Sequence, residues 1–372
     1  HDLAAAQSGG YGTYLDTGRH QIVSASPELF FDRYPRTTNA DELITRPMKG
    51  TAPRGRWQAE DDRRRRDLET SEKDRAENLI IVDLLRNDLG RVCQFGSVEV
   101  KDLLTIERYD TVWQLTSTIT GEVDSRLGLV DVLGALFPCG SITGAPKVRT
   151  MEIIADMEST PRGVYTGAIG FVAPGDAAGP RVSFSVGIRT VVIDSETGDA
   201  EYGVGGGITY DSDPAAEHEE ALLKARILDY GRSDFSLLET MRWNPVGGWY
   251  WLDRHLERLE ASAEYFGVPL DKAKVGSRLE AAVAGVSEES RVRLSIGRRG
   301  AIRVEVVPLI REERPSVALA IDMEPVDTRS PFLYHKTTRR EVYETRQARH
   351  PDADDVLLIN HSNELTESTI AN

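Results

Sequence analysis

The sequence pattern breaks and restarts once along the chain, and this break limits what the chain can fold into. Short β-branched runs and helical patterns alternate up to residue 230, stop at the loop-forming residues 231–234 (GRSD), and begin again with a strand-like run at residues 237–243. A chain of 372 residues also exceeds the usual size of one domain. The pattern therefore predicts two domains, residues 1–232 and residues 233–372.

The elements of the first segment do not follow a regular strand–helix–strand repeat. Residues 76–88 (AENLIIVDLLRND) and 215–228 have the apolar spacing of helices, whereas residues 181–193 (RVSFSVGIRTVVI) alternate like one strand. After the break, a turn at residues 244–248 leads to a second strand, and a helix is expected over residues 253–266. This pattern is typical of an α+β fold rather than of a regular parallel sheet.

Charge and composition exclude several classes of protein. The net charge of −15 argues against a nucleic-acid partner, because phosphate binding requires clustered Lys and Arg. The one basic run, residues 63–66, lies among acidic residues, as a solvated helix face does. The two cysteines, Cys93 and Cys139, exclude a disulfide framework and favour a reducing compartment. Since no apolar run approaches the ~20 residues of a membrane span and no signal peptide is visible, we expect a soluble, cytoplasmic protein with no membrane partner.

Two pairs of carboxylates have the spacing of neighbours on one helix face. Asp74 and Glu77 open one predicted helix, and Glu217 and Glu220 open another, each pair with i,i+3 spacing. Mg²⁺ takes oxygen ligands and is commonly held by one or two carboxylates together with substrate oxygens. Acidic residues at a helix start also complement the helix dipole, so each pair alone leaves both interpretations open.

Two glycine-containing segments suggest close backbone approach to a ligand. Gly205, Gly206 and Gly207 form either a tight turn or a surface whose N–H groups face an anion. Residues 140–147 (GSITGAPK) superficially resemble a phosphate-binding loop. They fail its pattern because Ala-Pro, rather than Lys-Ser/Thr, follows the second glycine, so the sequence argues against nucleotide binding.

Five motifs occur together in the order found in one enzyme family. They are SPE at 26–28, RPMKGT at 46–51, AENL with VDLLRND at 76–88, GAPK at 144–147 and the glycine run. In this order they resemble the chorismate-utilising enzymes, which include anthranilate, aminodeoxychorismate, isochorismate and salicylate synthases. The resemblance covers roughly residues 20–230 and implies a chorismate-binding, two-sheet, sandwich-like domain with flanking helices.

One position of the resemblance separates two groups within the family. Anthranilate synthases typically have Ala in the Arg-Pro-x-x-Gly-Thr motif and aminodeoxychorismate synthases typically have Lys, and this chain has Lys49. The resemblance implies that Lys49 attacks C2 of chorismate as the C4 hydroxyl leaves, and that ammonia then enters at C4 and expels the lysine. An amine of pKa ~10.4 must have that pKa lowered before it can attack. Anthranilate synthase component I and a non-catalytic chorismate-binding module remain the alternative interpretations.

The resemblance assigns further roles by position. Glu28 corresponds to the carboxyl acid/base that handles the C4 oxygen, and Tyr165 and Arg189 correspond to residues that hold the enolpyruvyl carboxylate. Glu77 and Glu220 correspond to direct Mg²⁺ ligands, with Asp74 and Glu217 behind them or bound through water, and the ion would neutralise the ring carboxylate. The substrate pocket would be lined by Thr51, Ser141, Lys147, Gly205, Gly206 and Gly207.

Two features limit what this segment does by itself. Gln114 stands where many family members have His, and an amide cannot shuttle a proton, so an acid/base role at this position is in doubt. Neither cysteine lies in a context typical of a glutaminase nucleophile. We therefore expect ammonia to come from a glutamine amidotransferase partner or from solution.

The second segment contains its own ordered motifs, DRHLERL at 253–259, YHKTT at 334–338 and TESTIAN at 366–372. They resemble the class IV pyridoxal-phosphate enzymes, namely branched-chain and D-amino-acid aminotransferases and aminodeoxychorismate lyase, and imply the N-terminal part of that α+β fold. The resemblance implies that Lys336 binds pyridoxal 5′-phosphate covalently, that Glu367 pairs with the pyridinium nitrogen, and that Arg258 contacts the phosphate bidentately.

The reaction of this second segment is suggested by its neighbour rather than by its motifs. A synthase that makes aminodeoxychorismate beside a lyase that splits it to p-aminobenzoate and pyruvate is a coherent pair, and tethering raises the effective concentration of one site near the other. The chain starts with His1 and stops at Asn372 inside a predicted element, so we expect a fragment truncated at both ends. Such a fragment should hold the cofactor poorly, because the rest of the phosphate-binding region would be absent.

Overall fold

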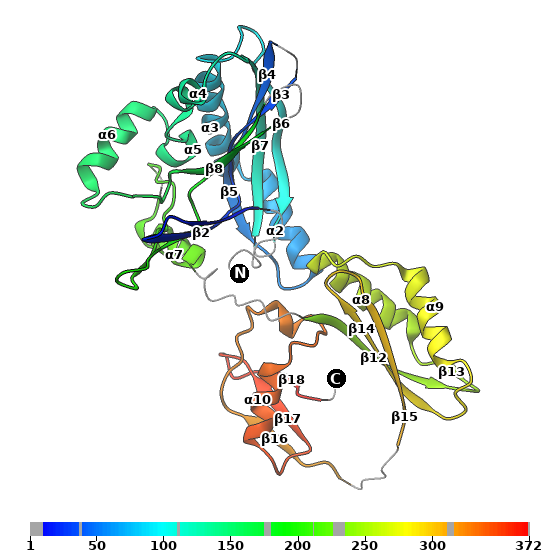
Figure 1. The fold of residues 1–372 in the computed structure, drawn as a ribbon. Helices are drawn as coiled ribbons and strands as arrows, with labels where there is room; N and C mark the ends of the chain where they lie inside the picture. The colour runs from blue at the N-terminus through cyan, green and yellow to red at the C-terminus, as the bar shows by residue number, and fades with distance from the viewer. Residues whose placement is uncertain are drawn as a thin grey trace. The chain divides into compact units, whose positions relative to one another are not determined.

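The structure is a computed structural model that describes residues 10–36, 39–109, 112–174, 180–210, 212–225, 235–310 and 316–370, apart from the side chain of residue 223. Its elements form two compact units, His1–Arg54 with Arg63–Arg232 and Gly55–Asp62 with Ser233–Asn372 (Figure 1). Gly55–Asp62, which includes the start of α2 (Gln58–Thr70), therefore groups with the second unit, and no sequence pattern indicated this. The pattern break at residues 231–234 lies outside the described residues.

The first unit contains two antiparallel sheets. The four-stranded sheet has the order β1-β2-β10-β11, and the seven-stranded sheet has the order β5-β7-β4-β3-β9-β8, with β6 also paired to β7. The smaller sheet consists of β1 (Tyr11–Asp16), β2 (His20–Ser26), β10 (Thr190–Asp194) and β11 (Ala200–Tyr202). The larger consists of β3 (Leu29–Pro35), β4 (Ala40–Arg46), β5 (Met48–Pro53), β6 (Glu99–Arg108), β7 (Val112–Asp124), β8 (Ala168–Ala173) and β9 (Arg181–Val186). The predicted α+β class is thus confirmed.

Helices flank these sheets and carry the predicted acidic pairs. The remaining helices of this unit are α3 (Glu72–Gly90), α4 (Leu129–Leu136), α5 (Gly140–Thr143), α6 (Lys147–Met157) and α7 (Pro214–Ala225). α3 begins four residues before the predicted helix because Ser71 caps it, its hydroxyl accepting from the Asp74 backbone N–H at 3.3 Å. α7 confirms the start of the helix predicted at residues 215–228, whose last three residues lie outside the described part of the chain.

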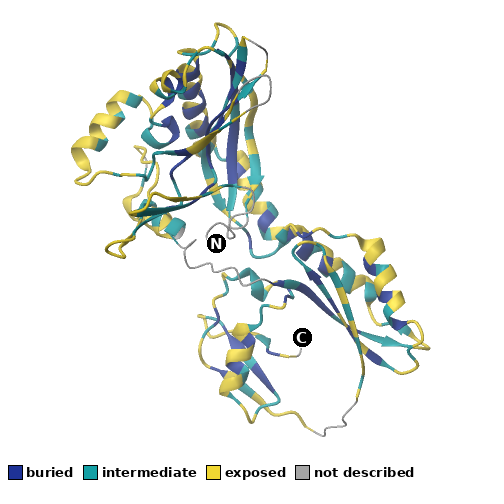
Figure 2. Ribbon diagram, in the orientation of Figure 1, coloured by how far each residue is buried: buried dark blue, intermediate teal, exposed yellow. Residues whose placement is uncertain are grey.

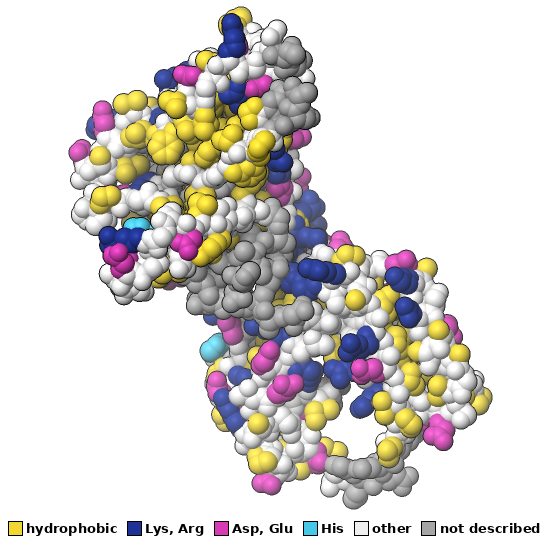
Figure 3. All heavy atoms as spheres, in the orientation of Figure 1, with side chains coloured by type: hydrophobic (Ala, Val, Ile, Leu, Met, Phe, Trp, Pro, Cys, Tyr) yellow, Lys and Arg dark blue, Asp and Glu magenta, His cyan; other side chains and the backbone are white. Residues whose placement is uncertain are grey.

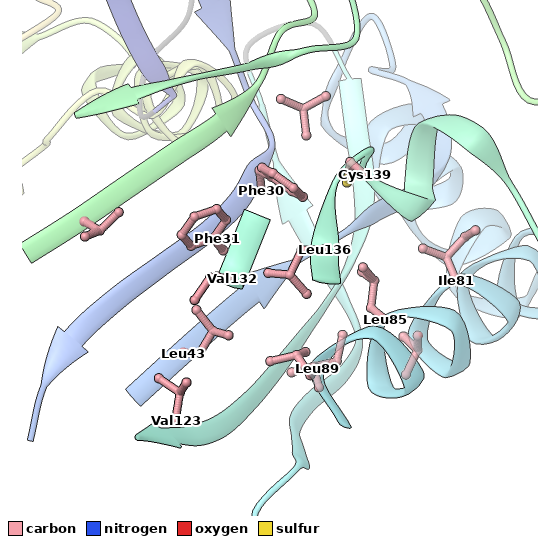
Figure 4. Packing of buried hydrophobic residues seen from close by; sticks show 14 residues of the cluster. Phe30, Phe31, Leu43, Ile81, Leu85, Leu89, Val123, Val132, Leu136 and Cys139 are labelled. Atoms are coloured by element: carbon pink, nitrogen blue, oxygen red, sulfur yellow. The ribbon is translucent and has the colours of Figure 1, made fainter. Parts of the chain in front are cut away.

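The core of the first unit lies between α3 and the larger sheet. α3 presents Ile81, Leu85 and Leu89 from one face, toward Phe31 on β3 and Leu43 on β4 (Figure 4). Burial of each such side chain contributes about 1.5–3 kcal/mol to stability. This packing fixes α3 on the sheet, and with it the acidic residues in the first two turns of the helix.

The alternating run at residues 181–193 is not one strand, so that prediction was wrong. It is divided between β9 in the larger sheet and β10 in the smaller, because Arg189 has a φ of 49° in the left-handed region. The chain also changes sheets between β2 and β3, at Glu28. The two crossings are joined by hydrogen bonds from Ala25 N to Arg189 O (3.0 Å) and from Val186 N to Glu28 O (3.1 Å). Two predicted site residues, Glu28 and Arg189, therefore lie where the chain passes between the sheets.

The second unit also combines two sheets with helices. One sheet has the order β13-β12-β14-β15, and the other has the order β16-β17-β18 with β16 parallel to β17. The strands are β12 (Ser236–Asn244), β13 (Gly248–Trp249), β14 (Ser290–Gly297), β15 (Ile302–Pro308), β16 (Leu319–Asp322), β17 (Asp355–Ile359) and β18 (Leu365–Ser368). The helices are α8 (Leu252–Phe266), α9 (Lys272–Val283), the 3₁₀ turn η2 (Pro331–Leu333) and α10 (Glu341–Arg349). β12 and α8 confirm the strand and helix predicted after the pattern break.

Buried residues follow the strands and the inner faces of the helices in each unit (Figure 2). On the visible surface, acidic and basic side chains are interspersed (Figure 3). The basic run at residues 63–66 lies on α2 and is largely exposed, as expected of a solvated helix face. Among the described residues, no single helix has the length and apolar composition to cross a membrane; only the pair Leu129–Thr143 and Lys147–Met157, bent by 65°, meets those two criteria together.

Candidate active site

Lys49 lies on β5, in a segment whose backbone is fixed by side chains from two other elements. Asn78 on α3 donates from Nδ2 to the carbonyl oxygen of Lys49 at 3.3 Å. Gln114 on β7 donates from Nε2 to Gly50 O at 2.9 Å and accepts from Thr51 Oγ1 at 3.0 Å. Gln114, which stands where many family members have His, therefore fixes the backbone beside Lys49 through hydrogen bonds to Gly50 and Thr51.

The amine of Lys49 lies beside the glycine run. A Cβ atom on Gly207 would be 2.8 Å from Lys49 Nζ, and one on Gly206 would be 3.0 Å from Glu217 Oε2. Contacts this short leave no room for a side chain unless the neighbour moves. The glycines thus allow a backbone segment to pass directly beside the predicted nucleophile and one of the predicted carboxylates.

Tyr165 packs against the other half of the same glycine segment. A Cβ atom on Gly203 would be 2.4 Å from its ring, and one on Gly205 would be 3.1 Å from its hydroxyl. Lys224 on α7 donates to the Gly205 carbonyl oxygen at 3.0 Å. Tyr165 also lines a cavity of about 380 Å³ whose other walls include residues of β2, β10 and β11. The predicted pocket residue Gly205 is therefore in contact with the predicted carboxylate-binding tyrosine.

The segments that carry Tyr165 and Arg189 are bonded to one another. Thr166 N donates to Gly187 O at 2.8 Å, and Gly187 N donates to Gly167 O at 2.7 Å. Thr166 and Arg189 have φ angles of 64° and 49°, a conformation that non-glycine residues rarely adopt and that costs of order 1–3 kcal/mol. Burial lowers the pKa of Arg189. A half-buried guanidinium whose interacting phenols are Tyr202 and Tyr109 suits an anionic ligand.

Glu28 is the most perturbed carboxyl of this site. It is 3% exposed, and its Oε1 atom has no hydrogen-bond partner among the described residues. Burial raises the pKa of Glu28 to about 7, although the Ser141 hydroxyl, the charge of Lys49 and the Met48 backbone each lower it. A carboxyl group with this pKa exchanges its proton near neutral pH, as a general acid or base must.

Three of the four predicted metal-side carboxylates lie close enough to influence one another. Burial raises the pKa of Glu77, and the charges of Asp74 and Glu217 raise it further, whereas the charge of Lys49 lowers it. Asp74 also accepts a hydrogen bond from Ser71 Oγ at 2.5 Å. Asp74, Glu217 and the lysine amine therefore all lie within electrostatic range of Glu77.

Glu220 is held differently. Its Oε1 atom lies 2.8 Å from Lys224 Nζ on the next turn of α7. Within the described part of the chain, no group of three His, Cys, Asp or Glu side chains converges as metal ligands. The oxygen donors nevertheless fit Mg²⁺ chemically, because it takes carboxylate oxygens as ligands and its charge would offset the burial that raises the pKa of Glu77. Glu220 would have to exchange Lys224 for the ion.

Lys147 has a partner inside the protein. Its Nζ atom donates to Asp88 Oδ2 at 2.5 Å and to Leu136 O at 3.1 Å, and both side chains of this ion pair are largely buried. These bonds tie the start of α6 to α3 and to the end of α4. The contacts seen for Lys147 are thus structural, and its predicted substrate contact remains a proposal.

In the second unit, Lys336 lies alongside β12. Its carbonyl oxygen accepts from Leu238 N at 2.9 Å. Burial lowers the pKa of Lys336, as do the charges of Arg258 and Arg340, whereas the charge of Glu239 raises it. The structure therefore places the predicted cofactor lysine near the predicted phosphate ligand Arg258.

Glu367, on β18, is tied to the same group of charges. Tyr343 on α10 donates to Glu367 Oε1 at 3.1 Å. Burial raises the pKa of Glu367, whereas Tyr343 and the charge of Arg340 lower it. Because Arg340 acts on both Glu367 and Lys336, the three predicted cofactor residues belong to one cluster. Its cations suit a phosphate, and its held carboxylate suits a pyridinium nitrogen, so the residues fit pyridoxal phosphate.

Several residues of both sites were not predicted from the sequence. Asn78 and Gln114 hold the Lys49 segment, and Glu239, Arg340 and Tyr343 hold or flank the residues of the second cluster. Glu239 had a visible signal, since it is a carboxylate among the apolar residues of a predicted strand. The other four act through contacts between distant segments, which sequence spacing does not indicate.

Comparisons with known proteins identify the family of each segment. The model of the chorismate binding enzyme family matches residues 1–229, and that of amino-transferase class IV matches residues 236–372. The chain is 46% identical over 225 residues to an aminodeoxychorismate synthase of Streptomyces griseus, covering 59% of this chain and 30% of that protein. It is 45% identical over 220 residues to an anthranilate synthase component 1 of Haloarcula marismortui, covering 59% and 41%.

A solved structure of a chorismate-utilising enzyme is also similar to part of this chain. Anthranilate synthase component I from Streptococcus pneumoniae matches with a TM-score of 0.52 and 33% identity, over 60% of this chain and 47% of that one. The chain spans less than half the length of each of these relatives. The family model covers more than half of this chain and includes Glu28, Lys49 and the acidic residues of α3 and α7. The chain therefore belongs to the family of chorismate-binding enzymes.

Proposed function

We propose that the chorismate-binding segment, residues 1–232, is that of an aminodeoxychorismate synthase, which converts chorismate and ammonia to 4-amino-4-deoxychorismate. The observation that carries the proposal is the position of Lys49. Its amine lies beside Gly207 and within electrostatic reach of Glu28 and Glu77. The similarity to an aminodeoxychorismate synthase of Streptomyces griseus supports it.

In the first step, the neutral amine of Lys49 attacks C2 of chorismate. The nitrogen–C2 bond forms, the ring double bond shifts, and the C4–oxygen bond breaks. Glu28 in its protonated form gives its proton to the departing C4 hydroxyl, which leaves as water. The pKa of about 7 keeps a large part of Glu28 protonated at neutral pH, which an exposed carboxyl would not achieve.

In the second step, ammonia replaces the lysine. Its nitrogen bonds to C4, the double bond shifts back, and the C2–nitrogen bond to Lys49 breaks, which restores the amine. The carboxylate of Glu28 accepts the proton that ammonia loses. Tyr165 and Arg189 hold the enolpyruvyl carboxylate through both steps, because they lie on bonded, strained segments with little freedom to move.

The carboxylates of α3 and α7 would hold Mg²⁺ in this proposal. Glu77 and Glu220 would be the direct ligands, with Asp74 and Glu217 behind them, and the ion would supply positive charge for the ring carboxylate. We expect a glutamine amidotransferase partner to deliver ammonia and the protein to work in the cytoplasm. Family membership motivates the first expectation, and the low cysteine content, which favours a reducing compartment, motivates the second.

We infer that the class IV segment, residues 233–372, is a pyridoxal-phosphate lyase that acts on the product of the first. Pyridoxal phosphate, held by Lys336, Arg258 and Glu367, supplies an electron sink when bound. Lys336 moves a proton at the substrate carbon that bears the amino group, and its lowered pKa favours the neutral amine that this requires. The products would be p-aminobenzoate and pyruvate.

The specific competitor is anthranilate synthase, because a relative with that name is about equally similar. Product analysis separates the two. The full-length protein is incubated with chorismate, Mg²⁺ and ammonium, and the products are resolved by chromatography. We expect 4-amino-4-deoxychorismate or p-aminobenzoate. Anthranilate as the main product would overturn the proposal.

A further inference from the structure

A buried carboxylate in the second unit, Glu239, has no part in the roles proposed so far. Glu239 lies on β12 and is 1% exposed, and its strand neighbours Leu237, Leu238 and Met241 are buried apolar residues. An ionised carboxylate in such a place is costly unless it is paired and hydrogen-bonded. The side chains that pair with Glu239 therefore indicate its role.

Glu239 accepts three hydrogen bonds or ion-pair contacts from one face of α8. Arg258 Nε donates to Oε1 at 2.8 Å and Arg258 Nη2 donates to Oε2 at 2.5 Å, which is a bidentate pair. His255 Nδ1 lies 2.7 Å from Oε2. The bidentate pair occupies the Nε–Nη2 edge of the guanidinium. Nη1 donates no hydrogen bond within the described part of the chain, so it is available to a second anion.

The surroundings of Arg258 are rich in positive charge. The positive charges of Arg258 and Arg340 lower the pKa of Lys336, and the negative charge of Glu239 raises it. Lys336 is also bonded to the same strand as Glu239, through the Leu238 N–H. Arg258, Arg340 and Lys336 face two carboxylates, Glu239 and Glu367, so the formal charges leave a net positive site, which suits a phosphomonoester dianion.

We propose that Glu239 is a positioning residue, which holds one edge of Arg258 so that the other edge meets the phosphate of the cofactor. The inference rests on the proposed role of Arg258 in phosphate binding. An arginine held in this way loses less conformational freedom when the phosphate binds than a free one would, because its side chain is already fixed. Glu239 itself does not contact the cofactor.

The test compares two cofactor forms that differ only in the phosphate. Dissociation constants of pyridoxal phosphate and of unphosphorylated pyridoxal are measured on the full-length apoprotein by absorbance titration. Glu239→Gln should weaken pyridoxal phosphate about tenfold or more and change pyridoxal by less than about twofold. In a protein that already has Arg258→Gln, the Glu239→Gln change should add almost nothing, because its effect passes through the arginine. Glu257→Gln, an exposed change of the same charge on α8, is the matched control and should bind both forms normally.

The outcomes separate this inference from the function on which it rests. Normal pyridoxal phosphate binding by Arg258→Gln would overturn the role of Arg258 itself. If Arg258→Gln loses the phosphorylated form selectively but Glu239→Gln binds it normally, or weakens both forms equally, the positioning role is overturned. If Glu239→Gln does not fold, Glu239→Asp keeps the charge but withdraws the carboxylate from the guanidinium. It should show a smaller loss confined to the phosphorylated form, and equal losses of both forms would contradict the inference.

Discussion

The amine of Lys49 lies so close to Gly207 that a Cβ atom on the glycine would be 2.8 Å from Nζ. The amine is the far end of a flexible side chain, so a methyl group at this position would displace it rather than disturb the fold. No left-handed φ is found at Gly207, and alanine can therefore adopt its backbone conformation. This contact offers a way to move the proposed nucleophile without removing it.

We predict that Gly207→Ala lowers kcat by about a hundredfold, because a displacement of about 1 Å at a reacting group costs that much. The free energy of unfolding should change by less than about 1 kcal/mol. Steady-state kinetics and urea denaturation measure the two effects. Gly134→Ala is the control, since a Cβ atom on that α4 glycine meets nothing within 4 Å. A normal kcat in Gly207→Ala would show that the position of the amine does not matter.

The raised pKa of Glu28 predicts a specific dependence of stability on pH. The pKa is about 7 in the folded protein and 4.5 as the ordinary value, so the folded state binds more protons between these limits. The free energy of unfolding of the wild type therefore falls as pH rises through this window, by roughly 3 kcal/mol in all. Glu28→Gln cannot titrate, so its free energy of unfolding should not fall in this window. The free energy of unfolding of the variant minus that of the wild type should therefore be larger at pH 8 than at pH 5. Urea unfolding at both pH values measures this difference, and an equal difference at the two pH values would contradict the assignment.

Activity should require Mg²⁺, and Glu77→Gln and Glu220→Gln should each raise the Mg²⁺ concentration needed for half-maximal rate, by about tenfold or more. The reason is the group of carboxylates near Lys49, where burial and, to a smaller extent, the charges of Asp74 and Glu217 raise the pKa of Glu77. Glu219→Gln, an exposed change on the same helix as Glu220, serves as the control. Activity that survives a chelator, or variants that titrate like wild type, would count against the metal site.

The protein should retain pyridoxal phosphate on Lys336, because Arg258 and Arg340 add positive charge beside this lysine and suit the phosphate. Borohydride reduction followed by peptide mass analysis should place the cofactor on Lys336, and Lys336→Ala should show no label. A full-length protein without label would refute the cofactor assignment.

The sequence was informative where local spacing determines the structure. The apolar face that packs α3 on the sheet is a repeat of Ile81, Leu85 and Leu89, and this periodicity is visible without the fold. It failed at residues 181–193, where strand-like alternation continues through a change of sheet. The left-handed turn at Arg189 is set by contacts with Ala25, far away in sequence, and local spacing cannot indicate it.

The candidate sites divide in the same way. Glu28, Lys49 and the carboxylates could be named from ordered motifs, since each motif is a local string. The contacts that hold them could not be predicted. Asn78 reaches Lys49 across 29 residues of sequence, and Arg258 reaches Glu239 across 19, so these pairs exist only after the strands and helices have packed.

The covalent role of Lys49 is the central claim, and a trapping experiment tests it most directly. The full-length protein is mixed with chorismate and Mg²⁺ without ammonia, quenched in acid and analysed by mass spectrometry. The account predicts an added mass of chorismate less one water on the peptide that carries Lys49, and its disappearance when ammonium is supplied. Lys49→Ala should carry no adduct and should form aminodeoxychorismate at least about a thousandfold more slowly while still binding chorismate, with anthranilate as a secondary product. An unlabelled wild-type peptide together with near-normal turnover of Lys49→Ala would contradict the account.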